Sequence, residues 1–207
     1  MNLDKDRLHM SSIRLEALGD GIFSIVMTIL VIELKLPVVK GNSFQDLLHG
    51  LYETRLELIC FFISFIILGI MWFGHRMVFE YISQVNRYFI FLGVLFYMVV
   101  CLVPFSTRFL AANTLQWYAI LMYALNLSTC NLALYIQWCY GIQRPTLHAR
   151  ILPKEVKVVA KRLFLISPIL YSVAIIFSFY FPLVSIIILF VTPILYLIPN
   201  KLDKYLP

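Results

Sequence analysis

Long, uninterrupted runs of apolar residues constrain this chain more than any other feature. Several of them exceed the roughly 18 residues that an apolar helix needs to cross a bilayer. Of the 207 residues, 61% are hydrophobic and 14% are charged, whereas a soluble domain carries about a quarter charged residues. A soluble globule could not keep so much apolar surface away from water. The sequence therefore predicts an all-α membrane protein, with residues 1–207 forming a single transmembrane domain.

Polar and proline-containing connectors divide the chain into six expected transmembrane helices. We place these spans at residues 17–35, 56–79, 88–106, 115–140, 163–181 and 183–198. Pro104 falls near the end of the third span, and Pro168 is expected to break the fifth. Between the first two spans, Ser43 can cap a short amphipathic helix. That helix is too short and too polar to cross, so we expect it in the membrane interface.

The distribution of Lys and Arg orients the six spans. With six spans, both termini share a side with the second and fourth connections. Thirteen of the 17 Lys and Arg residues lie on that side, and the other side holds Lys35, Lys40, Arg55 and Arg108. Because basic residues concentrate in cytoplasmic loops, the N- and C-termini are expected in the cytoplasm. The basic residues form no stripe with interleaved aromatics, so the lipid bilayer is an expected partner and nucleic acid is not.

Sequence motifs of enzymes and metal sites are missing. The chain has no G-x-S-x-G, H-E-x-x-H or Walker sequence. Its four histidines are scattered over both sides of the membrane, and its four cysteines show no C-x-x-C spacing. We therefore expect no enzymatic activity, no bound metal and no cofactor.

The stretch from Arg14 to Leu34 is the most polar of the expected spans. Asp20 lies at the predicted membrane edge, and Ser24 and Thr28 follow inside the apolar run. Such groups are costly in a membrane unless they meet protein or water. At about 100° per residue, the polar stripe runs directly beside Ile25, Ile29 and Ile32. Two interpretations remain open: a buried helix whose hydroxyls bond to its own carbonyls, or a helix that lines a water-filled path with isoleucines as a hydrophobic constriction.

Partners for this stretch are expected at the end of the second span. Trp72 and His75 lie there on neighbouring helix faces, at the same depth as Arg14 and Asp20. This arrangement favours a defined polar network over catalysis. At the other end of the first span, Glu33 either reaches the interface beside Lys35 or concentrates cations at an outer mouth.

These residues resemble the transmembrane protein 175 family of potassium channels. The family signature, Arg-x-x-x-Phe-Ser-Asp, opens the first helix, and the matching stretch here runs from Arg14 to Asp20. In it, Leu18 replaces the Phe and Gly19 replaces the Ser. Two further stretches are similar to bacterial members: Trp72-Phe-Gly-His75-Arg76 and Pro104-Phe-Ser-Thr107. The resemblance covers most of the chain.

The resemblance implies roles for particular residues. In the family, the first helix lines the pore, and the aliphatic residue five positions after the motif Asp forms the main constriction, which corresponds to Ile25. The further pore-facing positions correspond to Thr28, Ile29 and Ile32. An interhelical polar network in the family corresponds to Arg14, Asp20, Trp72 and His75.

The resemblance also implies an assembly and a function. Animal members carry two six-helix repeats, whereas this chain has one set and is similar to the bacterial form, a homotetramer. We therefore expect a potassium-permeable channel for monovalent cations in a bacterial inner membrane, with potassium as the permeant ion. The alternatives are a secondary transporter, proton-coupled through Asp20 and His75, and a non-conducting membrane scaffold. A flux that saturates and depends on a counter-ion gradient would favour the transporter, and a protein that passes no ions would favour the scaffold.

Overall fold

The computed structural model describes residues 10–35, 37, 39, 41–148 and 154–197. Helices account for nearly all of this part of the chain. Their bounds are α1 Ile13–Ile32, α2 Phe44–Glu53, α3 Arg55–Tyr81, α4 Arg87–Val100, α5 Val103–Ala112, α6 Trp117–Ile142, α7 Lys154–Ser178, α8 Pro182–Val191 and α9 Ile194–Leu197, with a 3-10 turn η1 at Pro145–Leu147. Two short strands, β1 (Met10–Ser11) and β2 (Gln84–Val85), pair in antiparallel fashion.

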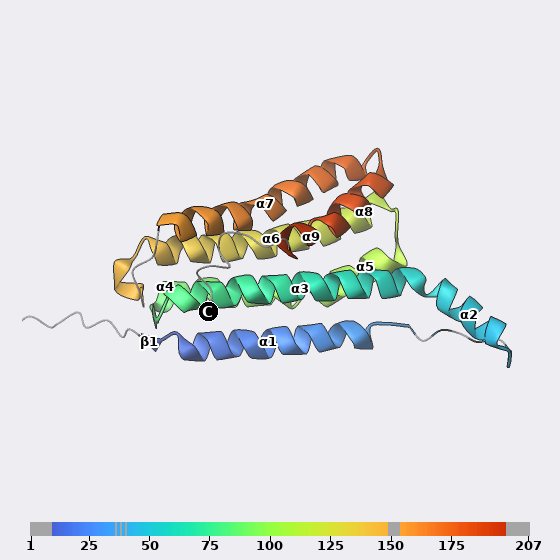
Figure 1. Ribbon diagram of the computed structural model, residues 1–207, viewed down its shortest axis with the longest axis horizontal. Coiled ribbons are helices and arrows are strands. Elements are labelled where there is room, and N and C mark those ends of the chain that lie inside the picture. Colours follow the sequence, from blue (N-terminus) through green and yellow to red (C-terminus); the bar gives the residue numbers. More distant parts are fainter. Residues whose placement is uncertain (1–9, 36, 38, 40, 149–153, 198–207) are drawn as a thin grey trace, which may run out of the picture.

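The long helices lie side by side along one axis (Figure 1). α1 forms one side of the bundle and α7 the opposite side, with α3 and α6 between them. The largest fully buried side chains include Phe89 and Phe96 of α4, together with Tyr123 and Trp138 of α6. The core therefore lies inside a single protomer, and α1 packs on its edge.

Five helical stretches are long and apolar enough to cross a membrane. They are Ile13–Ile32, Arg55–Tyr81, Arg87–Ala112, Trp117–Ile142 and Val156–Ser178. The sixth expected span corresponds to a shorter apolar stretch, Pro182–Tyr196. The expectation of an all-α membrane protein is confirmed, while the sixth span falls short of a full crossing helix and the end expected at 198 lies outside the described residues.

The structure corrects three of the expected spans. The third is two helices, since α4 ends at Val100 and α5 begins at Val103, with Pro104 in its first turn, where a proline needs no backbone N–H. The fifth is not broken at Pro168, because α7 continues through it. α7 also begins at Lys154, so the polar connector is shorter than expected. The first span begins at Ile13 and ends at Ile32.

The short helix α2 begins as the sequence predicts. Ser43 is its N-cap, and the Ser43 hydroxyl accepts a hydrogen bond from the Asp46 N–H at 3.1 Å. The Asp46 carboxylate accepts one from the Ser43 N–H at 3.0 Å, which completes a capping box. α2 lies beyond the end of the bundle (Figure 1).

Candidate functional site

Helix α1 has one buried face and one open face. Its buried residues recur at helical spacing and pack toward the rest of the protomer: Leu15, Gly19, Phe23, Val26 and Leu30. The opposite face is open along the whole helix, with exposed side chains at Ile13, Leu18, Ile25, Val31 and Ile32. In a membrane, such a face meets lipid, another chain or a water-filled path.

The open face carries the polar stripe and most of the isoleucines. Ile25 is 59% exposed and Ile32 is 77% exposed. Ser24 and Thr28 lie on the same face, and Ile29 is half-buried at its edge. Both hydroxyls nevertheless donate to carbonyls of their own helix, Ser24 to Asp20 at 2.7 Å and Thr28 to Ile25 at 2.7 Å. The hydroxyl bonds agree with the first of the two interpretations, although the face that carries them is open and not buried, and the water-filled path stays a prediction.

Near the N-terminal end of α1, Asp20 contacts the second span. The indole Nε1 of Trp72 donates a hydrogen bond to the Asp20 carboxylate at 2.7 Å. Arg14 is exposed, and within the described part of the chain no hydrogen bond or ion pair involves its side chain. Of the four residues expected in the polar network, the structure therefore joins Asp20 to Trp72 and leaves Arg14 apart.

His75 is fully buried and bonds to a residue that the sequence pattern did not single out. Its Nε2 lies 2.7 Å from the hydroxyl of Tyr97 on α4. The Tyr97 hydroxyl donates its proton to the Leu15 carbonyl at 2.8 Å. Because that hydroxyl has one proton, the Nε2 of His75 must carry the proton that joins the two rings. A relay of His75, Tyr97 and the Leu15 carbonyl thus ties α3 and α4 to the first turn of α1.

Gly19 leaves the space that this relay occupies. A Cβ atom at Gly19 would lie 2.5 Å from His75 Cε1 and 2.7 Å from the Tyr97 hydroxyl. The position where the family signature has Ser is therefore filled here by the rings of two other helices. A signal for Tyr97 was present in the sequence, since a tyrosine inside an apolar span needs a partner for its hydroxyl.

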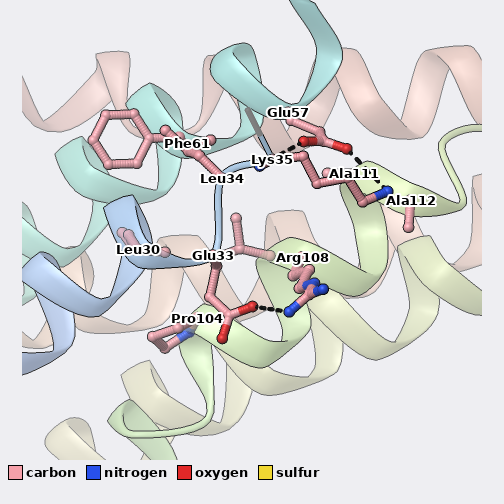
Figure 2. A pocket seen from close by; sticks show the side chains of 11 residues that line it. Leu30, Glu33, Leu34, Lys35, Glu57, Phe61, Pro104, Arg108, Ala111 and Ala112 are labelled. Atoms are coloured by element: carbon pink, nitrogen blue, oxygen red, sulfur yellow. Dashed lines mark hydrogen bonds and ion pairs between the residues drawn. The ribbon is translucent and has the colours of Figure 1, made fainter. Parts of the chain in front are cut away.

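At the C-terminal end of α1, two ion pairs flank a small cavity of about 30 Å³ (Figure 2). Arg108 of α5 donates to the Glu33 carboxylate. The Lys35 ammonium lies 3.4 Å from the Glu57 carboxylate of α3. Glu33 and Lys35 therefore each pair with a different helix and not with each other.

The described residues show no candidate metal site. No three His, Cys, Asp or Glu side chains in that part of the chain gather closely enough to hold a metal ion. The groups that the site offers are hydroxyls, isoleucines and paired charges, which suit the passage or positioning of an ion better than its tight coordination.

Comparison with known proteins finds similarity to one family of channels. The profile of the endosomal/lysosomal potassium channel TMEM175 matches residues 14–104. A potassium channel of Streptomyces collinus is 39% identical over 98 residues, which cover 47% of either chain. A potassium channel of a Chryseobacterium strain is 28% identical over 192 residues, or 93% of this chain and 95% of the relative.

A solved structure shows the same fold. The crystal structure of a lysosomal potassium-selective channel TMEM175 homolog from Chamaesiphon minutus superposes with a TM-score of 0.77 at 27% identity, over 89% of this chain and 95% of the other. The sequence matches to the Streptomyces channel and to a Chamaesiphon channel span about half the length of those relatives, 47% and 48%.

Proposed function

Because the chain belongs to the TMEM175 family and has the size of its single-repeat bacterial members, we propose that it is a potassium-permeable cation channel. The family is one of channels, not enzymes. In this proposal four copies assemble around an axis that their α1 helices line, within the inner membrane of a bacterium. Potassium is the permeant ion and not a fixed cofactor.

The open face of α1 carries this proposal. The whole face from Ile13 to Ile32 stays uncovered although the opposite face is packed into the bundle. Exposed apolar residues alone would suit lipid, but the stripe also includes Ser24 and Thr28, whose hydroxyls keep free acceptor sites after bonding to their own helix. When such faces form a ring around an axis, the hydroxyls and helix carbonyls line a water-filled path. The isoleucines of neighbouring copies then pack against one another.

Ile25 is the proposed main constriction, with Thr28, Ile29 and Ile32 lining the path beyond it. A narrow aliphatic ring offers no oxygen atoms to replace the water around an ion. Ions that pass must therefore lose part of their hydration shell, which costs potassium less than sodium because potassium holds its water more weakly. The proposed selectivity is modest for this reason.

The contacts at the N-terminal end of α1 are proposed to hold the lining helix in place. Trp72 fixes Asp20, and His75 fixes Leu15 through Tyr97. These bonds come from α3 and α4, which belong to the packed part of the protomer. In the assembled channel, we expect Arg14 to complete this network through a contact with a neighbouring copy.

The substitution Ile25→Asn tests the proposal. A polar side chain at the constriction lets water remain in the ring, so the barrier to ion entry falls. In vesicles that contain the purified protein, we expect potassium flux to rise several-fold and the preference for potassium over sodium to decrease. Ile25→Val is the matched control, because it keeps an aliphatic ring, and it should retain the preference. An Ile25→Asn protein with unchanged flux and selectivity would show that the constriction lies elsewhere.

A further inference from the structure

The last turn of α1 is joined to two other helices by charged side chains (Figure 2). Glu33 is the C-cap residue of α1, and its N–H donates to the Ile29 carbonyl at 3.1 Å. Its carboxylate accepts from Arg108 of α5. Two residues later, the backbone N–H of Lys35 donates to the Glu57 carboxylate at 3.1 Å, in addition to the Lys35–Glu57 ion pair. The chain is therefore held on both sides of the point where it leaves the helix.

The helix that carries Arg108 is itself anchored in the bundle. The Thr107 hydroxyl donates to the Ser64 hydroxyl of α3 at 2.9 Å, and the Asn126 amide of α6 donates to the Ser106 hydroxyl at 2.9 Å. Ser64, Ser106 and Thr107 are buried. Because these bonds are made by the two residues directly before Arg108, its guanidinium extends from a fixed support and not from a loose connector.

The ion pairs lie next to residues of the open face. Ile32 directly precedes Glu33, and Ile29 lies one turn before it. Ile32 is 77% exposed in the protomer, so packing within the chain does little to fix its direction. An α-helix transmits a rotation or displacement of its end along its length. The position of Glu33, together with the packing of Leu30 in the core, therefore influences how Ile29 and Ile32 face the proposed axis.

The four charges balance one another. Two carboxylates meet two cations, so the cluster has no net charge with which to concentrate cations. The Glu33 and Glu57 side chains are 31% and 20% exposed, and those of Arg108 and Lys35 are 55% and 62% exposed. Partly exposed ion pairs add little to folding stability. What such pairs can supply is a fixed geometry.

We propose that Arg108 is a positioning residue for permeation, which acts through its pair with Glu33 by holding the outer end of α1 so that Ile29 and Ile32 face the ion path. This inference rests on the proposed channel function. The two pairs couple α5 and α3 to the lining helix, and α5 in turn to α6. A movement of these helices would then change the width of the path near the C-terminal end of α1, which is the end opposite the Asp20–Trp72 contact.

A charge exchange between Glu33 and Arg108 tests the inference. We expect Arg108→Gln and Glu33→Gln each to change the potassium current several-fold and to shift the reversal potential between potassium and sodium. The double variant Glu33→Arg/Arg108→Glu restores the pair with opposite polarity and should return both quantities toward those of the unmodified protein. Arg108→Lys keeps the charge and should have a smaller effect than Arg108→Gln.

Arg55→Gln is the matched control. Arg55 is the first residue of α3, two positions before Glu57, and carries a positive charge. Its guanidinium lies over the Tyr52 ring at 3.8 Å and donates to the Tyr52 carbonyl. Its loss removes a charge without releasing α1, so current and reversal potential should stay unchanged. Gel filtration and thermal unfolding of each variant separate a positioning effect from a failure to fold or assemble.

Two outcomes would overturn the inference. In one, Arg108→Gln and Glu33→Gln conduct like Arg55→Gln, with the same reversal potential. In the other, the exchanged pair is folded and assembled but remains as altered as the single variants. An unmodified protein that conducts no cations would instead contradict the proposed channel function, and the two failures are thus distinguishable.

Discussion

At the scale of single residues, Gly19 determines how closely three helices approach. Its missing side chain lets the His75 ring and the Tyr97 hydroxyl reach the backbone of α1. The Trp72–Asp20 bond lies one residue further along the same helix. The N-terminal half of α1 is therefore held by side chains from its neighbours, and no side chain of its own is needed at position 19.

Gly19→Ala should destabilise the fold, although alanine favours helices over glycine. The new Cβ would lie 2.5 Å from His75 Cε1, so the ring must shift and the bond to Tyr97 must lengthen. Overpacking of this kind costs about 1–3 kcal/mol in the free energy of unfolding. Unfolding of the detergent-solubilised protein measures this cost. Gly69→Ala on α3 is the control, since a Cβ there would meet nothing within 4 Å. Equal stability of the two variants would contradict the account of Gly19.

The site illustrates what local sequence can and cannot predict. Asp20 and Trp72 could be paired because charge bias placed their spans antiparallel and their depth equal. The contacts of Tyr97 and Arg108 were not predicted. Each depends on how helices that are distant in sequence are rotated relative to one another, and the periodicity within one helix does not reveal this. The same reason explains why the partner of Glu33 was not predicted. The sequence suggests a position beside Lys35, whereas in the fold its carboxylate pairs with Arg108 of α5.

At the scale of elements, the prolines led to two wrong predictions: a break in the fifth span that is absent, and a continuous third span that is in fact divided. Pro168 lies inside α7, and the helix continues through it, with the Ser172 hydroxyl donating to the Pro168 carbonyl at 2.8 Å. The third span divides before Pro104, in a segment that sequence alone predicts as continuous. By contrast, the cap of α2 depends on four consecutive residues, and such local signals are predictable.

The capping box of α2 makes a prediction about pH. Hydrogen bonds from the Ser43 hydroxyl and N–H lower the pKa of Asp46 below its ordinary value. A lowered pKa means that the carboxylate stabilises the start of α2 above its unfolded pKa, and that this contribution is lost as pH falls through the folded pKa. Ser43→Ala removes the hydroxyl and should raise the pKa of Asp46, as followed by NMR titration of the side-chain carboxyl. Gln45→Ala changes the same turn and should leave that pKa in place. An unchanged pKa in Ser43→Ala would show that the backbone N–H alone holds it.

At the scale of the whole molecule, α1 is joined to its neighbours by polar bonds at both ends, and one of its faces stays open along its length. At the N-terminal end, β1 pairs with β2, and the Ser12 N–H donates to the Ser83 carbonyl at 3.0 Å. Ser83 in turn donates to the Leu147 carbonyl, so the connectors α3–α4 and α6–α7 meet there. The ion pairs of Glu33 and Lys35 hold the other end. A helix fixed in this way presents its open face as a constant surface.

That surface predicts self-association through α1. In a background in which the native cysteines are replaced by serine, Thr28→Cys should form disulfide-linked dimers on mild oxidation in the membrane, because the proposed arrangement of four α1 helices around an axis brings position 28 of adjacent copies together. Ile176→Cys is the control, since Ile176 is 64% exposed on α7, on the opposite side of the bundle from α1 (Figure 1). It should remain a monomer on non-reducing gels. The native mass of the detergent-solubilised protein, about four times the 24.1 kDa of one chain, measures the assembly independently. Efficient cross-linking through Ile176→Cys but not Thr28→Cys would place the assembly interface on α7, and the open face of α1 would then face lipid.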